Sequence, residues 1–289
     1  MCRSICLRQY NFFLNQAIIP LTNFETMPRS LQNNSHNSLL AATDSILSFI
    51  PFADFVEGSK LQPLLASFDE VASQPGLSPL QQKQYIIQRE WLTQLTVPQL
   101  EIILYSRGFI NPAAGESYIT LLGGNQHPLG RGSVHVDSND PLAPPLIAAN
   151  YLNNPFGASI NPSFDSTPNP PKLDTSVAVE FVRFATSLLN IDSLASVAQN
   201  VTHPASFEDA DILSHVKATI APGCHILGSA SMAPYNIGGV VDSELKVYNT
   251  TNLRVVDASI IPIHVGAHVQ SLVYVIAEKA ADIIQASSY

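Results

Sequence analysis

The sequence has little positive charge, few cysteines and no metal-binding pattern. Its 289 residues carry 14 Lys and Arg against 23 Asp and Glu, which gives a formal net charge of −9. This acidic balance argues against nucleic acid or an anionic membrane surface as a partner. The three cysteines, Cys2, Cys6 and Cys224, do not make a disulfide framework. Cys2 and Cys6 have no matching Cys or His pair at zinc spacing, so we expect no metal site.

Two further absences concern membranes and dinucleotides. The uncharged stretch 258–277 contains Pro262 and Gly266, so we do not expect it to span a membrane. The N-terminus has basic residues but no unbroken apolar core, so it is not a convincing signal peptide and the localisation stays unassigned. No Gly-x-Gly-x-x-Gly phosphate motif occurs, because the pairs Gly123-Gly124 and Gly238-Gly239 lack a third glycine.

Apolar periodicity predicts helices in the first hundred residues. They are expected at 38–55 with a break at Pro51, from Ser78 to Trp91, and from Pro98 through Leu104. We interpret Trp91 as a core residue. Further along, the patterns predict two strands and two helices, the strands at 118–122 and 133–136 and the helices at 174–189 and 209–217.

The C-terminal third, from Gly223, carries the most chemistry. The apolar run Leu253 to Val256 is predicted as a buried strand, and Asp257 at its end either accepts hydrogen bonds from ligand hydroxyls or caps the next turn. Apolar residues at helical spacing predict a helix over 269–286. Few charges lie near its start, which we expect to be buried. The unpaired N–H groups of such a helix start stabilise an anionic ligand.

Two histidines of this region are candidate acid–base groups. His225 and His268 each lie beside a Gly-containing break, and imidazole titrates near neutrality. The alternative is that both are ordinary core or surface histidines without a catalytic role. We expect two other histidines, His203 and His215, to lie at the surface. A Cys224–His225 nucleophile is disfavoured, because sequence neighbours on an extended chain point to opposite sides. A serine hydrolase is disfavoured too, since no Gly-x-Ser-x-Gly motif occurs.

Several independent motifs, taken in order, resemble the glucose–methanol–choline (GMC) oxidoreductases. The C-terminal ones are His225 followed by small residues and Met232, Gly-Gly-Val-Val-Asp at 238–242, Leu-Arg-Val-Val-Asp-Ala-Ser at 253–259, and a His-containing helix start before Ala-Glu-Lys-Ala-Ala-Asp at 277–282. A second matching block covers 127–134 and 140–152, with Gly130 where the family usually has Ser. We interpret Arg131 of this block as structural or as a buried ion-pair partner, and not as a catalytic residue. The resemblance is specific over 118–156 and 222–287 and loose over 1–117.

The resemblance implies an FAD-dependent enzyme that oxidises the CH–OH group of a small-molecule alcohol by hydride transfer to flavin N5. It implies that His225 is the main acid–base group and that His268 shares the work. By the same carry-over, Asp257 and Ala258 touch the ribityl–diphosphate part of FAD, and His268, Val269 and Gln270 meet the pyrimidine edge of the flavin. Neither the particular alcohol nor the oligomeric state is assigned.

The expected fold class is α+β. Residues 1–221 would form the substrate-domain portion: 1–117 mostly helical, 118–156 the antiparallel-sheet signature, and 157–221 a loop and helices. Residues 222–289 would form the catalytic and FAD-contacting segment, with the C-terminal strand and helix of an FAD-binding α/β domain whose N-terminal part is missing. The alternative is a truncated, catalytically inactive fragment or a non-catalytic remnant of such an enzyme.

Overall fold

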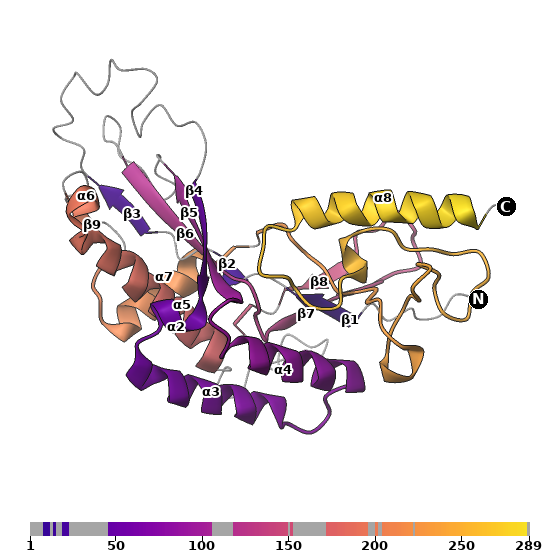
Figure 1. Cartoon of the computed structure of the whole chain (residues 1–289), viewed down its shortest axis with the longest axis horizontal. Coiled ribbons are helices and arrows are strands. Elements are labelled where there is room, and N and C mark those ends of the chain that lie inside the picture. The colour runs from indigo at the N-terminus through magenta and orange to yellow at the C-terminus, as the bar shows by residue number, and fades with distance from the viewer. Residues whose placement is uncertain are drawn as a thin grey trace, which may run out of the picture.

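The computed structural model describes residues 8–11, 14–15, 19–22, 46–105, 118–149, 151–152, 172–195, 200–201, 204–221 and 223–287. Most of this part is a layer of antiparallel strands covered by helices, followed by a loop-rich C-terminal segment that ends in a long helix (Figure 1). The expected mixture of helices with antiparallel sheet is confirmed. None of the described helices is long and apolar enough to cross a membrane.

The larger sheet has six strands in the order β4-β5-β6-β3-β9, with β2 also paired to β6. Every pairing in it is antiparallel. Its strands are β2 (Leu14–Asn15), β3 (Ile19–Thr22), β4 (Ile46–Pro51), β5 (Pro98–Tyr105), β6 (Tyr118–Asn125) and β9 (Asn200–Val201). Strand β6 confirms the prediction at 118–122.

A smaller antiparallel sheet has the order β1-β7-β8. Its strands are β1 (Arg8–Asn11), β7 (Arg131–His135) and β8 (Leu146–Ala148). Strand β7 confirms the strand predicted at 133–136, shifted by two residues at its start. Strands from both motif blocks are therefore paired in this sheet, Ser133 with Ala148 and Val134 with Ile147.

Four longer helices precede the C-terminal segment: α3 (Gly58–Ala72), α4 (Pro79–Trp91), α5 (Lys172–Ser187) and α7 (Asp209–Thr219). Helix α5 packs on strands β3 and β6 of the larger sheet, α3 and α7 pack on α5, and α4 packs on α3. The predicted helices at 78–91, 174–189 and 209–217 are confirmed. Helix α4 begins with a capping box, in which the Ser78 side chain accepts from Gln81 N and the Gln81 side chain accepts from Ser78 N. This arrangement satisfies two backbone donors that a helix start otherwise leaves open.

The larger sheet and helix α5 meet where the sequence has a glycine. A Cβ at Gly123 in β6 would overlap the ring of Phe181 from α5. Both belong to a tightly packed contact, since Phe181 is buried within the main apolar core. The short elements near this core are α2 (Phe52–Phe55), α6 (Asp192–Ala195) and the 3-10 turn η2 (Leu188–Asn190).

Two predicted helices are wrong. Residues 46–51 of the predicted helix 38–55 form strand β4, and residues 38–45 lie outside the described residues. Residues 98–105 form strand β5, between β4 and β6, in place of the helix predicted from Pro98 to Leu104. Short apolar runs do not distinguish the two states, and both runs are rich in Ile, which favours strands when sheet partners are present.

Arg131 at the start of β7 is structural, as interpreted. It is fully buried, donates from Nη1 to the carbonyl oxygens of Pro128 and Gly130, and lies over the Tyr85 ring at 5.5 Å from the ring centroid. Nearby, the buried Asp174 carboxylate accepts the backbone N–H groups of Leu129 and Gly130. Burial nevertheless raises the pKa of Asp174 to about 6. The loop between β6 and β7 is therefore held by buried polar contacts.

The surface assignment of His215 is wrong, because its place on α7 faces the core and only 9% of it is exposed. His203 lies outside the described residues. Trp91 is half-buried, and its ring lies 4.7 Å, centroid to centroid, from the ring of the buried His127. This contact agrees with its interpretation as a packing residue.

The C-terminal segment has little regular structure before its last helix. It contains the 3-10 turns η3 (Tyr235–Ile237) and η4 (Ala258–Ile260) and then α8 (Gln270–Ala286), which confirms the helix predicted at 269–286. The predicted strand 253–256 belongs to neither sheet. It makes one isolated bridge, Lys246 with Arg254, and its Leu253 and Val256 side chains are exposed.

Helix α8 has apolar side chains on two faces. Its inner face packs through Leu272, Ile276, Ala280 and Ile283. On the outer face Tyr274 is 67% exposed and Val275 is 62% exposed, with exposed Ala277, Ala281 and Ile284 along the same side. In Figure 1 the helix runs along the side of the molecule opposite α3 and α4. Glu278, Lys279 and Asp282 are exposed as well, so this outer face mixes apolar and charged side chains.

Candidate active site

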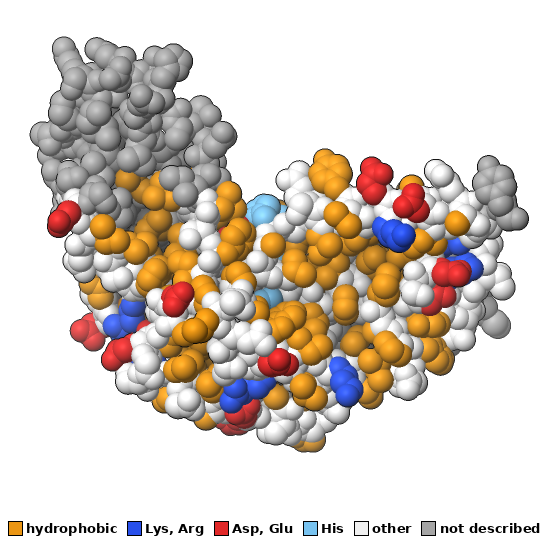
Figure 2. All heavy atoms as spheres, viewed as in Figure 1, with side chains coloured by type: hydrophobic (Ala, Val, Ile, Leu, Met, Phe, Trp, Pro, Cys, Tyr) orange, Lys and Arg blue, Asp and Glu red, His pale blue; other side chains and the backbone are white. Residues whose placement is uncertain are grey.

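The structure brings the two candidate histidines together. His225 Nε2 and His268 Nε2 lie 3.2 Å apart although the residues are 43 positions apart in the sequence. The rings meet edge to face, with centroids 4.4 Å apart and an interplanar angle of 89°. Figure 2 shows histidine surface at the bottom of a hollow between the sheet and the region of α8, bordered by apolar side chains. His268 is exposed and His225 is half-buried, so the pair is accessible to solvent.

A small apolar cluster holds the two histidine-bearing segments against each other. Leu227, two residues after His225, packs with Ile261 and with Val269, the residue after His268. All three side chains are buried. The backbone at Cys224 is left-handed, with φ of 58°, immediately before His225. A non-glycine residue in this conformation costs free energy, and the surrounding packing must offset that cost.

A third polar residue completes the arrangement from the middle of the sheet. Glu101 of β5 is only 4% exposed, and its Oε1 lies 2.9 Å from His268 Nδ1. The other carboxylate oxygen, Oε2, accepts a hydrogen bond of 3.0 Å from Gln126 Nε2. The side chain of His268 is 44% exposed. A buried carboxylate thus fixes one ring nitrogen of His268, while part of the ring is exposed to solvent.

These contacts determine where protons are held. The Glu101 carboxylate accepts, so His268 Nδ1 carries a hydrogen and donates it. One proton then lies between the two Nε2 atoms, donated by His225 when His268 is neutral or by His268 when it is an imidazolium. Burial lowers the pKa of His225, and the neighbouring His268 lowers it further, although Glu101 opposes both. The free imidazole of His225 is accordingly favoured near neutral pH.

The other predicted site residues are distributed around the start of α8. Asp257 is exposed, and its Oδ1 accepts a 2.8 Å hydrogen bond from Ser259 N at the start of η4, which is the capping alternative. Ala258 is half-buried and Gln270 is exposed, whereas Val269 is buried. The helix start was expected to be buried. Among the described residues nothing covers Gln270 and Ser271, so the first turn of α8 is open.

One residue of the second motif block lies near the segment that carries His225. Tyr151 lies near enough to Cys224 that the thiol, after the larger effect of burial, raises the pKa of its phenol. Tyr151 therefore lies near the segment that carries His225. Leu152 is a further non-glycine residue with left-handed backbone, at φ of 60°.

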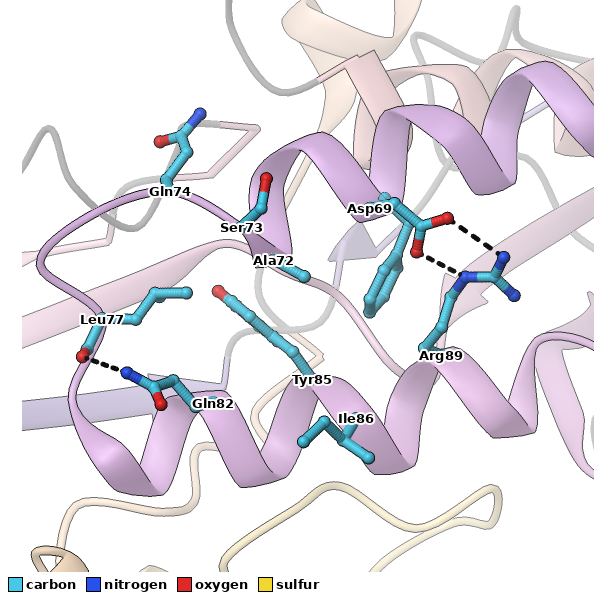
Figure 3. A pocket seen from close by; sticks show the side chains of 10 residues that line it. Asp69, Ala72, Ser73, Gln74, Leu77, Gln82, Tyr85, Ile86 and Arg89 are labelled. Atoms are coloured by element: carbon cyan, nitrogen blue, oxygen red, sulfur yellow. Dashed lines mark hydrogen bonds and ion pairs between the residues drawn. The ribbon is translucent and has the colours of Figure 1, made fainter.

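A separate pocket of about 390 Å³ lies between α3 and α4 and contains none of the predicted site residues. Figure 3 shows Tyr85 on its floor and the ion pair of Asp69 with Arg89 at its edge. The two carboxylate oxygens of Asp69 each accept a hydrogen bond from the Arg89 guanidinium. Among the described residues, no group of three His, Cys, Asp or Glu side chains is placed to hold a metal ion.

A family model described as GMC oxidoreductase matches residues 128–277, which include His225 and His268. The chain belongs to the GMC oxidoreductase family. This GMC chain is 32% identical over 237 residues to a dehydrogenase of Armillaria gallica, in an alignment that covers 81% of this chain and 35% of that protein. It therefore spans about a third of that relative's length.

Solved structures agree in fold. An FAD-dependent oxidoreductase from Chaetomium thermophilum matches with a TM-score of 0.65 and 19% identity, over 96% of this GMC chain and 48% of the other. A fungal aryl-alcohol oxidase matches with a TM-score of 0.62 and 22% identity, over 94% of this chain and 48% of the other. The GMC chain thus spans about half the length of these two proteins.

Glu101 of this GMC chain is the site residue that the sequence reasoning missed. It lies outside the matched motifs and 167 positions from His268. One signal was present, because a single acidic residue interrupts the apolar run Leu100 to Leu104. A charged residue is almost never fully buried unless it is paired. If that run is taken as a buried strand, Glu101 requires a partner.

Proposed function

We propose that this protein is an FAD-dependent oxidoreductase that acts on CH–OH groups of a small-molecule alcohol. The observation that carries the proposal is the contact between His225 and His268, backed by the buried carboxylate of Glu101. Family membership supports the reaction class, and among similar structures one is described as FAD-dependent and another as an aryl-alcohol oxidase. Within this proposal, residues 222–289 form the catalytic and FAD-contacting segment and 1–221 the substrate-domain portion.

The residues at the start of α8 fit one end of a flavin. The N-cap residue Val269 gives no side-chain hydrogen bond to the first turn, and the helix carries no acidic residue there. Backbone N–H groups at an open helix start suit an electron-rich oxygen. His268, Val269 and Gln270 would hold the pyrimidine edge, Val269 through its backbone. When bound, FAD supplies the acceptor for the hydride of the alcohol.

The η4 turn fits the chain of hydroxyl groups next to the flavin ring. Asp257 keeps its carboxylate exposed while one oxygen holds Ser259 N, so the other oxygen is open to a hydroxyl donor. Ala258 follows without a side chain that would obstruct a ligand. We propose that Asp257 and Ala258 contact the ribityl–diphosphate part.

The chain's own residues account for the proton. His225, favoured as the free imidazole, accepts the hydroxyl proton of the alcohol as its C–H bond is broken. His268 shares the positive charge, because the hydrogen on His225 Nε2 can pass to His268 Nε2 across their 3.2 Å contact. Glu101 stabilises the positive charge that the pair gains and keeps His268 oriented through Nδ1. General-base assistance of this kind contributes about 10²- to 10⁴-fold in rate.

A second candidate is a fragment or remnant that catalyses nothing by itself. The large apolar side chains Tyr274 and Val275 on the outer face of α8 support it, because both are exposed. The absence of a Gly-x-Gly-x-x-Gly motif also supports it, since the helix start under the FAD diphosphate would have to come from elsewhere.

Visible absorbance with added FAD separates the two candidates. The first proposal expects a bound-flavin spectrum that survives gel filtration and is bleached anaerobically by an alcohol. His225→Ala should keep the flavin band and lose most of the bleaching rate. A chain that retains no FAD at millimolar concentration supports the fragment. A His225→Ala protein that is bleached as fast as the parent contradicts the acid–base assignment.

A further inference from the structure

The loop that presents His268 contains another histidine, His264, which is only 1% exposed. This loop runs from Pro262 to His268, between the η4 turn and α8. Within it, Ala267 N donates to Val265 O at 2.8 Å, which closes a three-residue turn directly before His268. The direction in which the His268 ring leaves the backbone depends on this turn.

The His264 side chain stabilises this turn through a hydrogen bond. Its Nδ1 lies 2.7 Å from the carbonyl oxygen of Val265, and a carbonyl can only accept, so the Nδ1–H donates. Val265 O therefore receives two hydrogen bonds, one from the His264 ring and one from Ala267 N. Burial lowers the pKa of His264 to about 3, which keeps the ring neutral and the donor at Nδ1 near neutral pH.

The loop is also fixed to the sheet side of the molecule. Gln84 from α4 donates to the carbonyl of Pro262. The buried His127 ring lies against the backbone of both His264 and Pro98. Gly266 passes so close to Pro98 that a Cβ there would lie 3.0 Å from the carbonyl oxygen of that residue. Since Pro98 begins β5, the loop docks on the strand that carries Glu101.

We propose that His264 is a positioning residue for His268: its Nδ1–H fixes the Val265 carbonyl, and the resulting turn aims His268 Nδ1 at Glu101 and His268 Nε2 at His225. The inference rests on the proposed function, because it assigns the support for the same histidine pair. Its structural content is independent of flavin and alcohol. Without the donor, the turn keeps only the Ala267 hydrogen bond, and the His268 ring loses its fixed direction.

Two substitutions separate the donor from the space it fills. His264→Asn places an amide N–H near the position of Nδ1 and keeps the hydrogen bond to Val265 O. His264→Phe keeps a ring of similar size and removes the donor. His264→Gln, whose amide reaches the position of Nε2, also lacks the Nδ1 donor and replaces His264→Phe if that variant does not fold. His135→Phe on β7 controls for the loss of a histidine elsewhere.

The first measurement is histidine NMR on the ¹⁵N-labelled 289-residue chain without cofactor, with circular dichroism to verify folding. We expect the parent, His264→Asn and His135→Phe to show a slowly exchanging Nδ1 proton on His268. In His264→Phe that proton should be lost to exchange. The pKa of His225 should also rise, because the neighbouring His268 that lowers it has moved away. A folded His264→Phe chain with an unchanged His268 proton would overturn the proposal.

The second measurement is the rate of alcohol-dependent bleaching in FAD-loaded protein. We expect a loss of about 100-fold for His264→Phe, as a misplacement near 1 Å produces, and recovery to within a few-fold for His264→Asn. An equal loss in both variants would also overturn the positioning role. If the parent shows no bleaching while the NMR result holds, the proposed function fails and the support of His268 by His264 stands.

Discussion

Glu101→Gln tests the electrostatic part of the site with little change of shape. The amide is isosteric with the carboxylate, so its oxygen can still accept from His268 Nδ1. Its NH₂ group would then face Gln126 Nε2, which now donates to Glu101 Oε2. A flip of the Gln126 amide lets its buried Oε1, which has no hydrogen-bond partner, accept from the new NH₂ group, while the Gln126 NH₂ group takes the unpartnered place. The number of unpartnered groups on the Gln126 amide stays the same. The fold should therefore tolerate the substitution.

The cost should appear in the chemistry. A hydrogen bond to a charged group contributes about 1.5–3 kcal/mol and a neutral one about 0.5–1.5 kcal/mol, so replacing the carboxylate with the amide costs about 1–1.5 kcal/mol when the histidine pair becomes positively charged. At about 1.4 kcal/mol per factor of ten, the rate of flavin reduction should fall roughly 5- to 10-fold. FAD binding should change little, because Glu101 lies behind His268 and contacts no proposed cofactor residue except that ring.

Anaerobic single-turnover reduction of the FAD-loaded protein, followed at saturating alcohol, measures this effect. Glu101→Asp is the matched control, because it keeps the charge but shortens the side chain by one methylene. A Glu101→Gln protein that is folded, holds FAD and is reduced within threefold of the parent rate would refute the reasoning. A large drop in its melting temperature would show instead that the carboxylate mainly supports the fold.

Two further predictions concern stability. Burial lowers the pKa of His127 to about 4 and of His264 to about 3, so the unfolded chain binds more protons below pH 6.5 and stability should fall as pH is lowered from 6.5 toward 4. Asp174, with its pKa raised to about 6, binds a proton in the folded state below pH 6 and so offsets one of the two histidines. The free energy of unfolding should then fall by about 1.4 kcal/mol per pH unit. Urea unfolding midpoints at pH 6 and pH 5 measure this fall, and equal midpoints would contradict it. Gly123→Ala should cost about 1–3 kcal/mol, because the new methyl overlaps the Phe181 ring, whereas Gly58→Ala meets nothing within 4 Å and should not destabilise the chain. Denaturant unfolding compares the two, and equal stability would show that the ring moves aside freely.

The sequence predicted those parts of the fold whose signals are local. Helix α8 followed from apolar residues at helical spacing, and α4 from Ser78 and Pro79 at its start. Strand β5 was predicted as a helix because Leu100 to Leu104 is a short apolar run that either structure can use. Its state is decided by pairing with β4 and β6, and that pairing joins residues distant in the chain.

The candidate site also has parts that local sequence signals predict and parts that they do not. His225 and His268 could be proposed from motifs, and the structure places their Nε2 atoms within hydrogen-bonding distance. Glu101 could not be connected with His268 from the sequence, because no local pattern joins residues 167 positions apart. The helix start was expected to be buried because charge is scarce there, but scarcity of charge does not specify which element covers a surface. The catalytic roles of these residues and their contacts with FAD stay predictions.

The place of Glu101 in β5 links correct pairing of the sheet to the proposed acid–base pair. Glu101 pairs with Phe49 on one side and Gly124 on the other, between Leu100 and Ile102. Since neighbouring side chains of a strand point to opposite faces, a slip of one residue would turn the carboxylate away from His268 and present an aliphatic side chain to it. A misregistered molecule would then be both misfolded and inactive. If the proposed chemistry holds, the specific activity of a preparation would be proportional to the fraction of molecules with the correct strand register.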